Sequence, residues 1–141
     1  YNYNLCNNMI LKNVLVLLGL LLLFGCNVGG AETLNSSNIE MITITSSGNF
    51  SYEECINRNL EDQYLMLESK YCGHCQKSLP LFLEVCEELN LTCNVIDISE
   101  DIEKEKLDYY KINIMYTPTF VFDCNYYVGA MEKSEFLEVL K

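Results

Sequence analysis

The stretch that decides the fold is Lys70–Pro80, "KYCGHCQKSLP", in which a glycine and the chain's only histidine separate two cysteines. A cysteine pair at this spacing binds a metal ion, forms a structural disulfide or exchanges electrons. The residues before it, "QYLMLES" at 63–69, are mostly apolar and predict a strand. The residues at 72–89 repeat apolar side chains at helical spacing and predict a long helix. The pair therefore stands where a strand passes into a helix.

This position favours thiolate chemistry. Cys72 begins the predicted helix, where unpaired N–H groups and the helix dipole favour an anion. The thiolate is the form of cysteine that attacks disulfides. Cys75, one helical turn later, is placed to resolve a mixed disulfide formed through Cys72. His74, when protonated, favours the Cys72 thiolate and thereby makes the disulfide a better oxidant.

Other roles fit the sequence less well. A zinc site usually needs four ligands in two close pairs, and the chain has no second C-x-x-C motif. Haem attachment needs a histidine directly after the second cysteine, where Gln76 stands. A purely structural disulfide between Cys72 and Cys75 would close a very short loop and would stabilise little. We therefore expect a redox role, with the Cys72–Cys75 disulfide as the redox group and with no other cofactor and no metal.

The remaining patterns predict an α/β domain. The expected order is β-α-β-α-β-α-β-β-α, in which the early alternation requires parallel strands and the late pair forms an antiparallel hairpin. Helices are then expected on both faces of a mixed sheet. The predicted strands lie at 41–46, 63–69, 93–98, 119–124 and 126–131, and the predicted helices at 51–60, 72–89, 99–112 and 132–141.

Local signals add detail to three of these elements. Ser51 and Glu54 have the spacing of a capping box at the start of a helix. The run "CNVIDI" at 93–98 is almost continuously apolar, which is typical of a strand buried on both faces. Ser99 is expected to cap the helix that follows, and Asn90 is expected to end the helix before it.

The first 38 residues predict export. Lys12 precedes the apolar run Val14–Phe24, which is short for a membrane span and suits a signal peptide. "LFGC" at 23–26 resembles the lipobox of prokaryotic lipoproteins, in which the cysteine, here Cys26, is lipidated and becomes the mature N-terminus. An uncleaved signal anchor is the alternative. Both readings place the remaining chain outside the cytoplasm on a membrane. The predicted division is an upstream extension and signal peptide at 1–25, a tether at 26–38 and a folded domain at 39–141.

Charge and cysteine content narrow the function further. The chain has 141 residues and a formal net charge of −11, and it lacks the basic run that a nucleic-acid-binding protein needs. In an oxidising compartment its eight cysteines indicate disulfide chemistry more than metal binding. Cys86 and Cys93 either pair across a connecting turn or stay as buried thiols. The partners of Cys55 and Cys124 are open.

The region 41–141 resembles the thioredoxin-fold oxidoreductases in three motifs. In "YCGHCQKSLP" an aromatic residue precedes the cysteine pair and Pro80 lies inside the helix, and CGHC is the tetrapeptide of protein disulfide isomerases. In "YTPTFVF", Thr117-Pro118 matches the cis-proline of the family. "YYVGAMEKSEFLEVL" is similar to the closing strand and helix, with Gly129 at the family's glycine.

The resemblance implies a thioredoxin fold, a central mixed sheet with helices on both faces. It implies that Pro118 lies beside the cysteines, and that Thr117 and Tyr116 flank a groove that binds the backbone of a substrate chain. One position departs from the family. Many relatives carry a buried acid six residues before the first cysteine, which moves protons for the inner thiol, and Met66 stands there. Glu68, two residues later on the same strand face, is the alternative acid.

Together these observations predict a membrane-tethered, extracytoplasmic thiol–disulfide oxidoreductase. Its expected partners are exported proteins that contain cysteine, and a membrane or extracytoplasmic redox partner that resets the pair. CGHC favours oxidation or isomerisation of clients. The alternatives are a reductant that serves cytochrome maturation and a non-catalytic module that binds exported partners.

Overall fold

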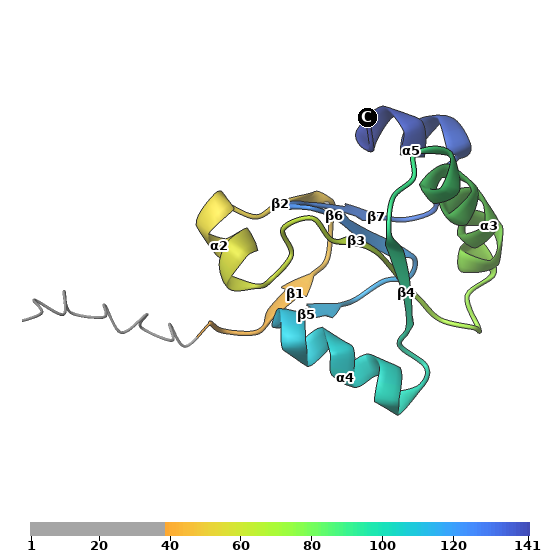
Figure 1. The fold of residues 1–141 in the computed structure, drawn as a ribbon. Coiled ribbons are helices and arrows are strands. Elements are labelled where there is room, and N and C mark those ends of the chain that lie inside the picture. Colours follow the sequence, from red (N-terminus) through yellow and green to blue (C-terminus); the bar gives the residue numbers. More distant parts are fainter. Residues whose placement is uncertain (1–38) are drawn as a thin grey trace, which may run out of the picture. The chain divides into compact units, whose positions relative to one another are not determined.

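A computed structural model describes residues 39–141 of the chain (Figure 1). The predicted signal peptide, tether and lipidation site at Cys26 lie outside the described residues. The elements in chain order are β1 (Ile42–Ile44), β2 (Gly48–Asn49), α2 (Tyr52–Asn57), β3 (Tyr64–Glu68), α3 (Gly73–Glu88), β4 (Cys93–Asp97), α4 (Asp101–Tyr110), β5 (Ile112–Ile114), β6 (Thr119–Phe122), β7 (Asn125–Val128) and α5 (Lys133–Val139).

Five strands form a mixed sheet in the order β2-β7-β6-β3-β4. β3 pairs with β4 in parallel and with β6 antiparallel, and β7 is antiparallel to both β6 and β2. A second, two-stranded parallel sheet joins β1 to β5. The predicted parallel and antiparallel pairings are confirmed. β2 and β5 were not expected from the sequence.

Helices cover both faces of the sheet, as predicted. The alternation of side chains along a strand sends Leu65 and Leu67 of β3 to one face and Met66 to the other. Leu65 and Leu67 pack in a core with α2, α4 and the β1–β5 pair. Met66 packs in a second core against α3 and α5, in which Phe82 contacts other aromatic rings. Figure 1 shows α3 and α5 together on one side and α4 on the other.

The prediction that residues 93–98 are buried on both faces is wrong. β4 is the edge strand of the five-stranded sheet and pairs only with β3 there. Ile96 is buried, but Asn94 is exposed and the rest of the strand is half-buried. An apolar run indicates that the side chains of a strand are covered, but it does not indicate whether both edges of the strand are paired. Helices can cover the side chains of an edge strand. β3 and β6 are the most deeply buried strands of the sheet.

The helix limits follow the sequence signals closely. In α2 the Ser51 hydroxyl accepts from the Glu54 N–H and the Glu54 carboxylate accepts from the Ser51 N–H, which is the predicted capping box. α3 ends at its C-cap Leu89, and Asn90 has the left-handed φ of 53° that stops the helix. α4 differs, because its N-cap is Glu100 without a side-chain cap. Ser99 does not cap it, so that prediction is wrong.

Two disulfides hold helices to the sheet. Cys55 of α2 is bonded to Cys124 in the turn between β6 and β7, across a sequence separation of 69. Cys86 of α3 is bonded to Cys93 at the start of β4, across a separation of 7. Both pairings, open at the level of sequence, are thereby assigned. Cys55–Cys124 thus attaches α2 to the β6–β7 turn, and Cys86–Cys93 attaches α3 to β4.

A buried arginine, Arg58, connects the residues just before β1 to the C-terminal end of α4. Arg58 is only 6% exposed, and its Nη1 donates to the carbonyl oxygens of Glu40, at 3.1 Å, and Lys111, at 2.5 Å. Lys111 is the C-cap of α4, so the guanidinium sits at the negative end of that helix. The Cζ atom of Arg58 lies over the Phe50 ring, 5.5 Å from its centre. Arg58 therefore connects α2, α4 and the residues before β1.

Candidate functional site

The reactive-looking cysteines lie where β3 passes into α3. Cys72 is the N-cap residue of α3, with an extended backbone at φ −93° and ψ 107°. Cys75 lies one turn later and is fully buried, whereas Cys72 is half-buried and reaches the surface. A disulfide joins them, with their Cα atoms 5.2 Å apart. The outer sulfur is thus the one that a second thiol can approach.

The helix start supplies one hydrogen-bond donor to the outer sulfur. The backbone N–H of Cys75 points at the Cys72 Sγ over 3.1 Å, and no acidic residue lies in the first turn of α3. These features favour a thiolate at Cys72 when the pair is reduced. His74 is exposed in the same turn, and Lys77 follows it. The arrangement matches the electrostatics expected from the sequence.

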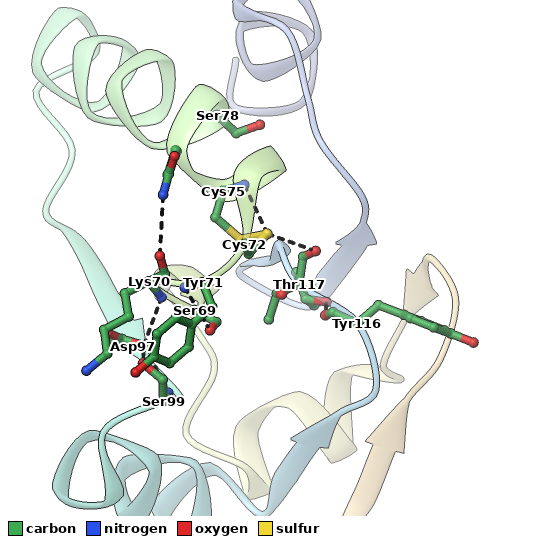
Figure 2. Close-up of a disulfide and its surroundings, with 12 residues drawn as sticks. Ser69, Lys70, Tyr71, Cys72, Cys75, Ser78, Asp97, Ser99, Tyr116 and Thr117 are labelled. Carbon is green, nitrogen blue, oxygen red and sulfur yellow. Dashed lines mark hydrogen bonds between the residues drawn. A yellow bond between two sulfur atoms is a disulfide. The ribbon is translucent and has the colours of Figure 1, made fainter.

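The loop before β6 closes over the pair. The Thr117–Pro118 peptide bond is cis, as expected, and Pro118 is buried. The Thr117 carbonyl oxygen lies 3.3 Å from the Cys72 Sγ (Figure 2). A carbonyl can only accept, so this contact favours a thiol over a thiolate, opposite to the effect of the helix N–H. A mixed disulfide carries neither proton nor charge on this sulfur, so it can still accept from the Cys75 N–H and does not repel the Thr117 carbonyl as a thiolate would.

Exposed aromatic side chains flank the disulfide. Tyr71 is 81% exposed on one side and Tyr116, from the loop before Pro118, is 55% exposed on the other. The Tyr116 carbonyl accepts from the Thr119 hydroxyl at 2.7 Å, which holds the loop to β6. Figure 2 shows Tyr116 and Thr117 on the opposite side of the disulfide from Tyr71. The structure therefore brings the predicted substrate-flanking residues to the cysteine pair.

The surroundings of the inner cysteine are apolar. Cys75 shares its buried cluster with Met66, Phe82 and Phe120, all fully buried. Glu68, the alternative acid, is half-buried at the end of β3. Burial raises the pKa of Glu68, and the nearby Asp97 carboxylate raises it further. The position six residues before Cys72 is thus a packing position here, and Glu68 is the acid that lies on the same strand face.

Sequence reasoning missed two polar residues next to the pair. Asp97 ends β4 and accepts from Ser99 and from the Lys70 backbone. Ser78 of α3 is buried, accepts from the Met131 N–H at 3.2 Å and lies 3.4 Å from the Met131 carbonyl. A signal existed for Asp97, since β3 and β4 were predicted parallel and the carboxyl ends of parallel neighbours meet at one edge. No local pattern distinguishes Ser78 from an exposed helix serine.

Residues 39–141 offer few side chains that could together bind a metal ion. The group there whose ligand atoms lie within 4.8 Å of one another is Cys55, Asp123 and Cys124. Its two sulfurs are joined as a disulfide, and metal ligation requires thiolates.

Comparison with known proteins identifies the fold. A family model described as Thioredoxin matches residues 42–141. Among solved structures, the X-ray structure of Fasciola hepatica thioredoxin is similar, with 18% sequence identity over 62% of this chain and 86% of that chain, at a TM-score of 0.43. No curated protein matches the chain. The fold is the thioredoxin fold, whose members generally exchange thiols and disulfides, and the chain belongs to the thioredoxin family.

Proposed function

We propose that this protein is a thiol–disulfide oxidoreductase that acts on exported proteins outside the cytoplasm. The observation that carries the proposal is the asymmetric disulfide at the start of α3. Its outer residue, Cys72, is partly exposed, and its inner residue, Cys75, is fully buried. Electron exchange through such a pair needs no further cofactor, because the disulfide is itself the two-electron redox group.

Oxidation of a client would proceed through two thiol–disulfide exchanges. A client thiolate attacks the Sγ of Cys72, which forms a mixed disulfide and releases the Cys75 sulfur, and that sulfur takes up a proton. The second client thiolate then attacks the client sulfur of the mixed disulfide and releases Cys72 as a thiolate. The client has gained a disulfide and the enzyme pair has gained two electrons. Reduction of a client is the same sequence reversed, with Cys75 as the resolving thiol.

The surface beside the pair would receive the client backbone. The Thr117 carbonyl lies against the outer sulfur, the next residue is the buried Pro118, and the residue before Thr117, Tyr116, is exposed. His74, exposed in the first turn of α3, would favour the reduced state when protonated and so make the disulfide more oxidising.

Two structural disulfides among residues 39–141, Cys55–Cys124 and Cys86–Cys93, support an oxidising location. Cytosolic proteins rarely keep structural disulfides, because glutathione and thioredoxin reduce them.

No helix in this part of the chain has the length and apolar character needed to cross a membrane. From the N-terminal sequence we propose membrane attachment, through lipidation of Cys26 or an uncleaved signal anchor. A Cys26→Ser change should release the protein from membranes if a lipid anchors it, whereas continued attachment would favour the signal anchor.

Trapping of a mixed disulfide tests the enzymatic proposal directly. The full-length Cys75→Ser variant, reacted with a disulfide-bonded model client, should accumulate a covalent complex that reducing agent dissolves. Cys72→Ser should form none and serves as the matched control. Reduced Cys72 should also react with iodoacetamide near about pH 6 faster than glutathione does, because only a thiolate reacts. Absence of both the complex and the fast alkylation would refute catalysis and favour the binding module.

The redox potential decides the direction. After equilibration with glutathione, a value between about −120 and −180 mV would mark an oxidant or isomerase, and a value near about −270 mV would mark a reductant such as one that serves cytochrome maturation. The CGHC motif favours the first outcome. A redox partner that resets the pair, at the membrane or elsewhere outside the cytoplasm, is part of the proposal in either case.

A further inference from the structure

The backbone of Lys70, two residues before Cys72, is held on both sides. Its N–H donates to Oδ1 of Asp97, at the end of β4, over 3.4 Å. Its carbonyl oxygen accepts from Nε2 of Gln76, in the second turn of α3, also over 3.4 Å. Figure 2 shows both bonds converging on Lys70 beside the disulfide. One exposed residue thus links the neighbouring strand to the active-site helix through its main chain.

The carboxylate in this link is fixed and ionised. Oδ1 of Asp97 also accepts from the Ser99 N–H at 2.9 Å and from the Ser99 hydroxyl at 2.5 Å. The hydroxyl of Ser99 is the main cause that lowers the pKa of Asp97, with smaller contributions from the Ser99 and Lys70 N–H groups. A carboxylate held by its own turn presents an oriented acceptor to the loop opposite.

The turn that follows Lys70 transmits this position to the reactive sulfur. The N–H of Cys72 donates to the Ser69 carbonyl at 2.8 Å, and the N–H of Tyr71 donates to the Ser69 hydroxyl at 3.3 Å. The turn from Ser69 to Cys72 is therefore internally bonded. It is attached to the end of the neighbouring strand through Asp97, and it ends at Cys72, the N-cap of α3.

We propose that Asp97 is a positioning residue for the reactive pair, which holds the Lys70 peptide so that the Cys72 sulfur stays aligned with the N–H of Cys75. This inference rests on the proposed redox function. Two opposite effects of Asp97 make it testable. Its charge alone disfavours a nearby thiolate, because like charges repel. Its hydrogen bond to the loop favours the thiolate by keeping the sulfur at the helix start. The positioning effect predicts that loss of Asp97 makes Cys72 less reactive.

The experiment measures alkylation of reduced Cys72 against pH in the full-length protein. Asp97→Ala should shift the midpoint of the rate profile upward and lower the rate near about pH 6 at least threefold, because the thiolate loses its donor. Asp97→Asn keeps an oxygen acceptor for the Lys70 N–H and removes the charge, so its rate should equal or exceed that of the unaltered protein. Glu100→Gln is the matched control: it removes one negative charge from the partner of the Lys70 side chain and leaves the main-chain link intact.

A second variant covers the case in which Asp97→Ala does not fold. Gln76→Ala removes the other half of the link from an exposed helix position and should shift the profile in the same direction. If Asp97→Ala or Gln76→Ala leaves the profile unchanged, or moves it downward as Glu100→Gln is expected to, the positioning role is refuted. Failure of the proposed function is distinct, because the unaltered protein itself would then show no fast alkylation.

Discussion

Removal of the Cys55–Cys124 disulfide should cost more stability than removal of Cys86–Cys93. The two bonds span sequence separations of 69 and 7. A cross-link restricts the unfolded chain, and this effect grows with the logarithm of loop length. The relation gives about 4.4 kcal/mol for the longer loop and about 2.5 kcal/mol for the shorter one. The predicted gap is therefore about 2 kcal/mol in favour of the long-range bond.

Packing losses do not obscure this difference. In each pair one cysteine is buried, Cys55 and Cys86, and its partner is half-buried. Alanine substitution therefore removes one buried and one partly covered sulfur in both cases. The cavity cost should be similar for the two double variants, and the difference between them reports the loop lengths.

Urea unfolding of the two double alanine variants measures the gap. The background should be Cys72→Ser/Cys75→Ser, so that the reactive pair cannot rearrange the remaining bonds. Circular dichroism gives the midpoint and slope of each transition. The variant that keeps Cys55–Cys124 should have the smaller slope, because the long-range cross-link keeps its unfolded chain more compact, so free energies and not midpoints alone are compared. The variant without Cys55 and Cys124 should unfold at the lower urea concentration. If the other variant loses as much free energy of unfolding or more, loop closure is not what these disulfides contribute.

The magnitudes also bear on the proposed location. Loss of both structural bonds amounts to roughly 7 kcal/mol, within the usual range of total stability for a single domain. A domain that depends on its cross-links to this degree would be marginal in a reducing compartment. The disulfides thus support the same extracytoplasmic proposal as the N-terminal sequence does, by an independent physical route.

Two further substitutions test the fold and its titration. Arg58→Met should lower the free energy of unfolding by about 2 kcal/mol in urea, because two carbonyl oxygens lose a charged donor; Arg58→Lys should lose less, and an unchanged midpoint for Arg58→Met would contradict the role. Glu68→Gln should stabilise near neutral pH, since burial raises the pKa of Glu68 and its ionised form costs stability. The gain should vanish below about pH 4, where Glu68 is protonated in both states, and a gain that persists there would show another cause.

The parts of the structure that follow from the sequence are those with local signals. The capping box at Ser51, the stop at Asn90 and the placement of Cys72 at a helix start each depend on a few adjacent residues. The resemblance of "YTPTFVF" to the family motif predicts a cis bond before Pro118, and the bond is cis. These features need no knowledge of distant contacts.

The parts that sequence reasoning missed depend on pairing between distant segments. β5 is three residues long, and its partner β1 lies about seventy residues earlier. The edge position of β4 depends on which strands pair with β3, a choice that its own apolar run does not record. The contact of Asp97 with Lys70 requires both the parallel register of Glu68 with Asp97 and the turn after β3. The sequence shows that a polar residue, Asp97, ends the predicted strand, but it does not show that this residue contacts Lys70.

The apolar surroundings of Cys75 bear on whether the pair would mainly reduce, isomerise or oxidise its clients. Resolution of a mixed disulfide needs the Cys75 thiolate, and burial against Met66 and Phe82 disfavours that ion. Attack by Cys75 should therefore be slow, and a client captured on Cys72 should remain attached for longer. In net reduction this delay limits turnover. In isomerisation it is useful, because a client thiol has time to attack the mixed disulfide and leave with a new pairing, without any proton transfer at Cys75. The buried methionine is thus consistent with the oxidant and isomerase reading of CGHC, and it argues against fast reduction.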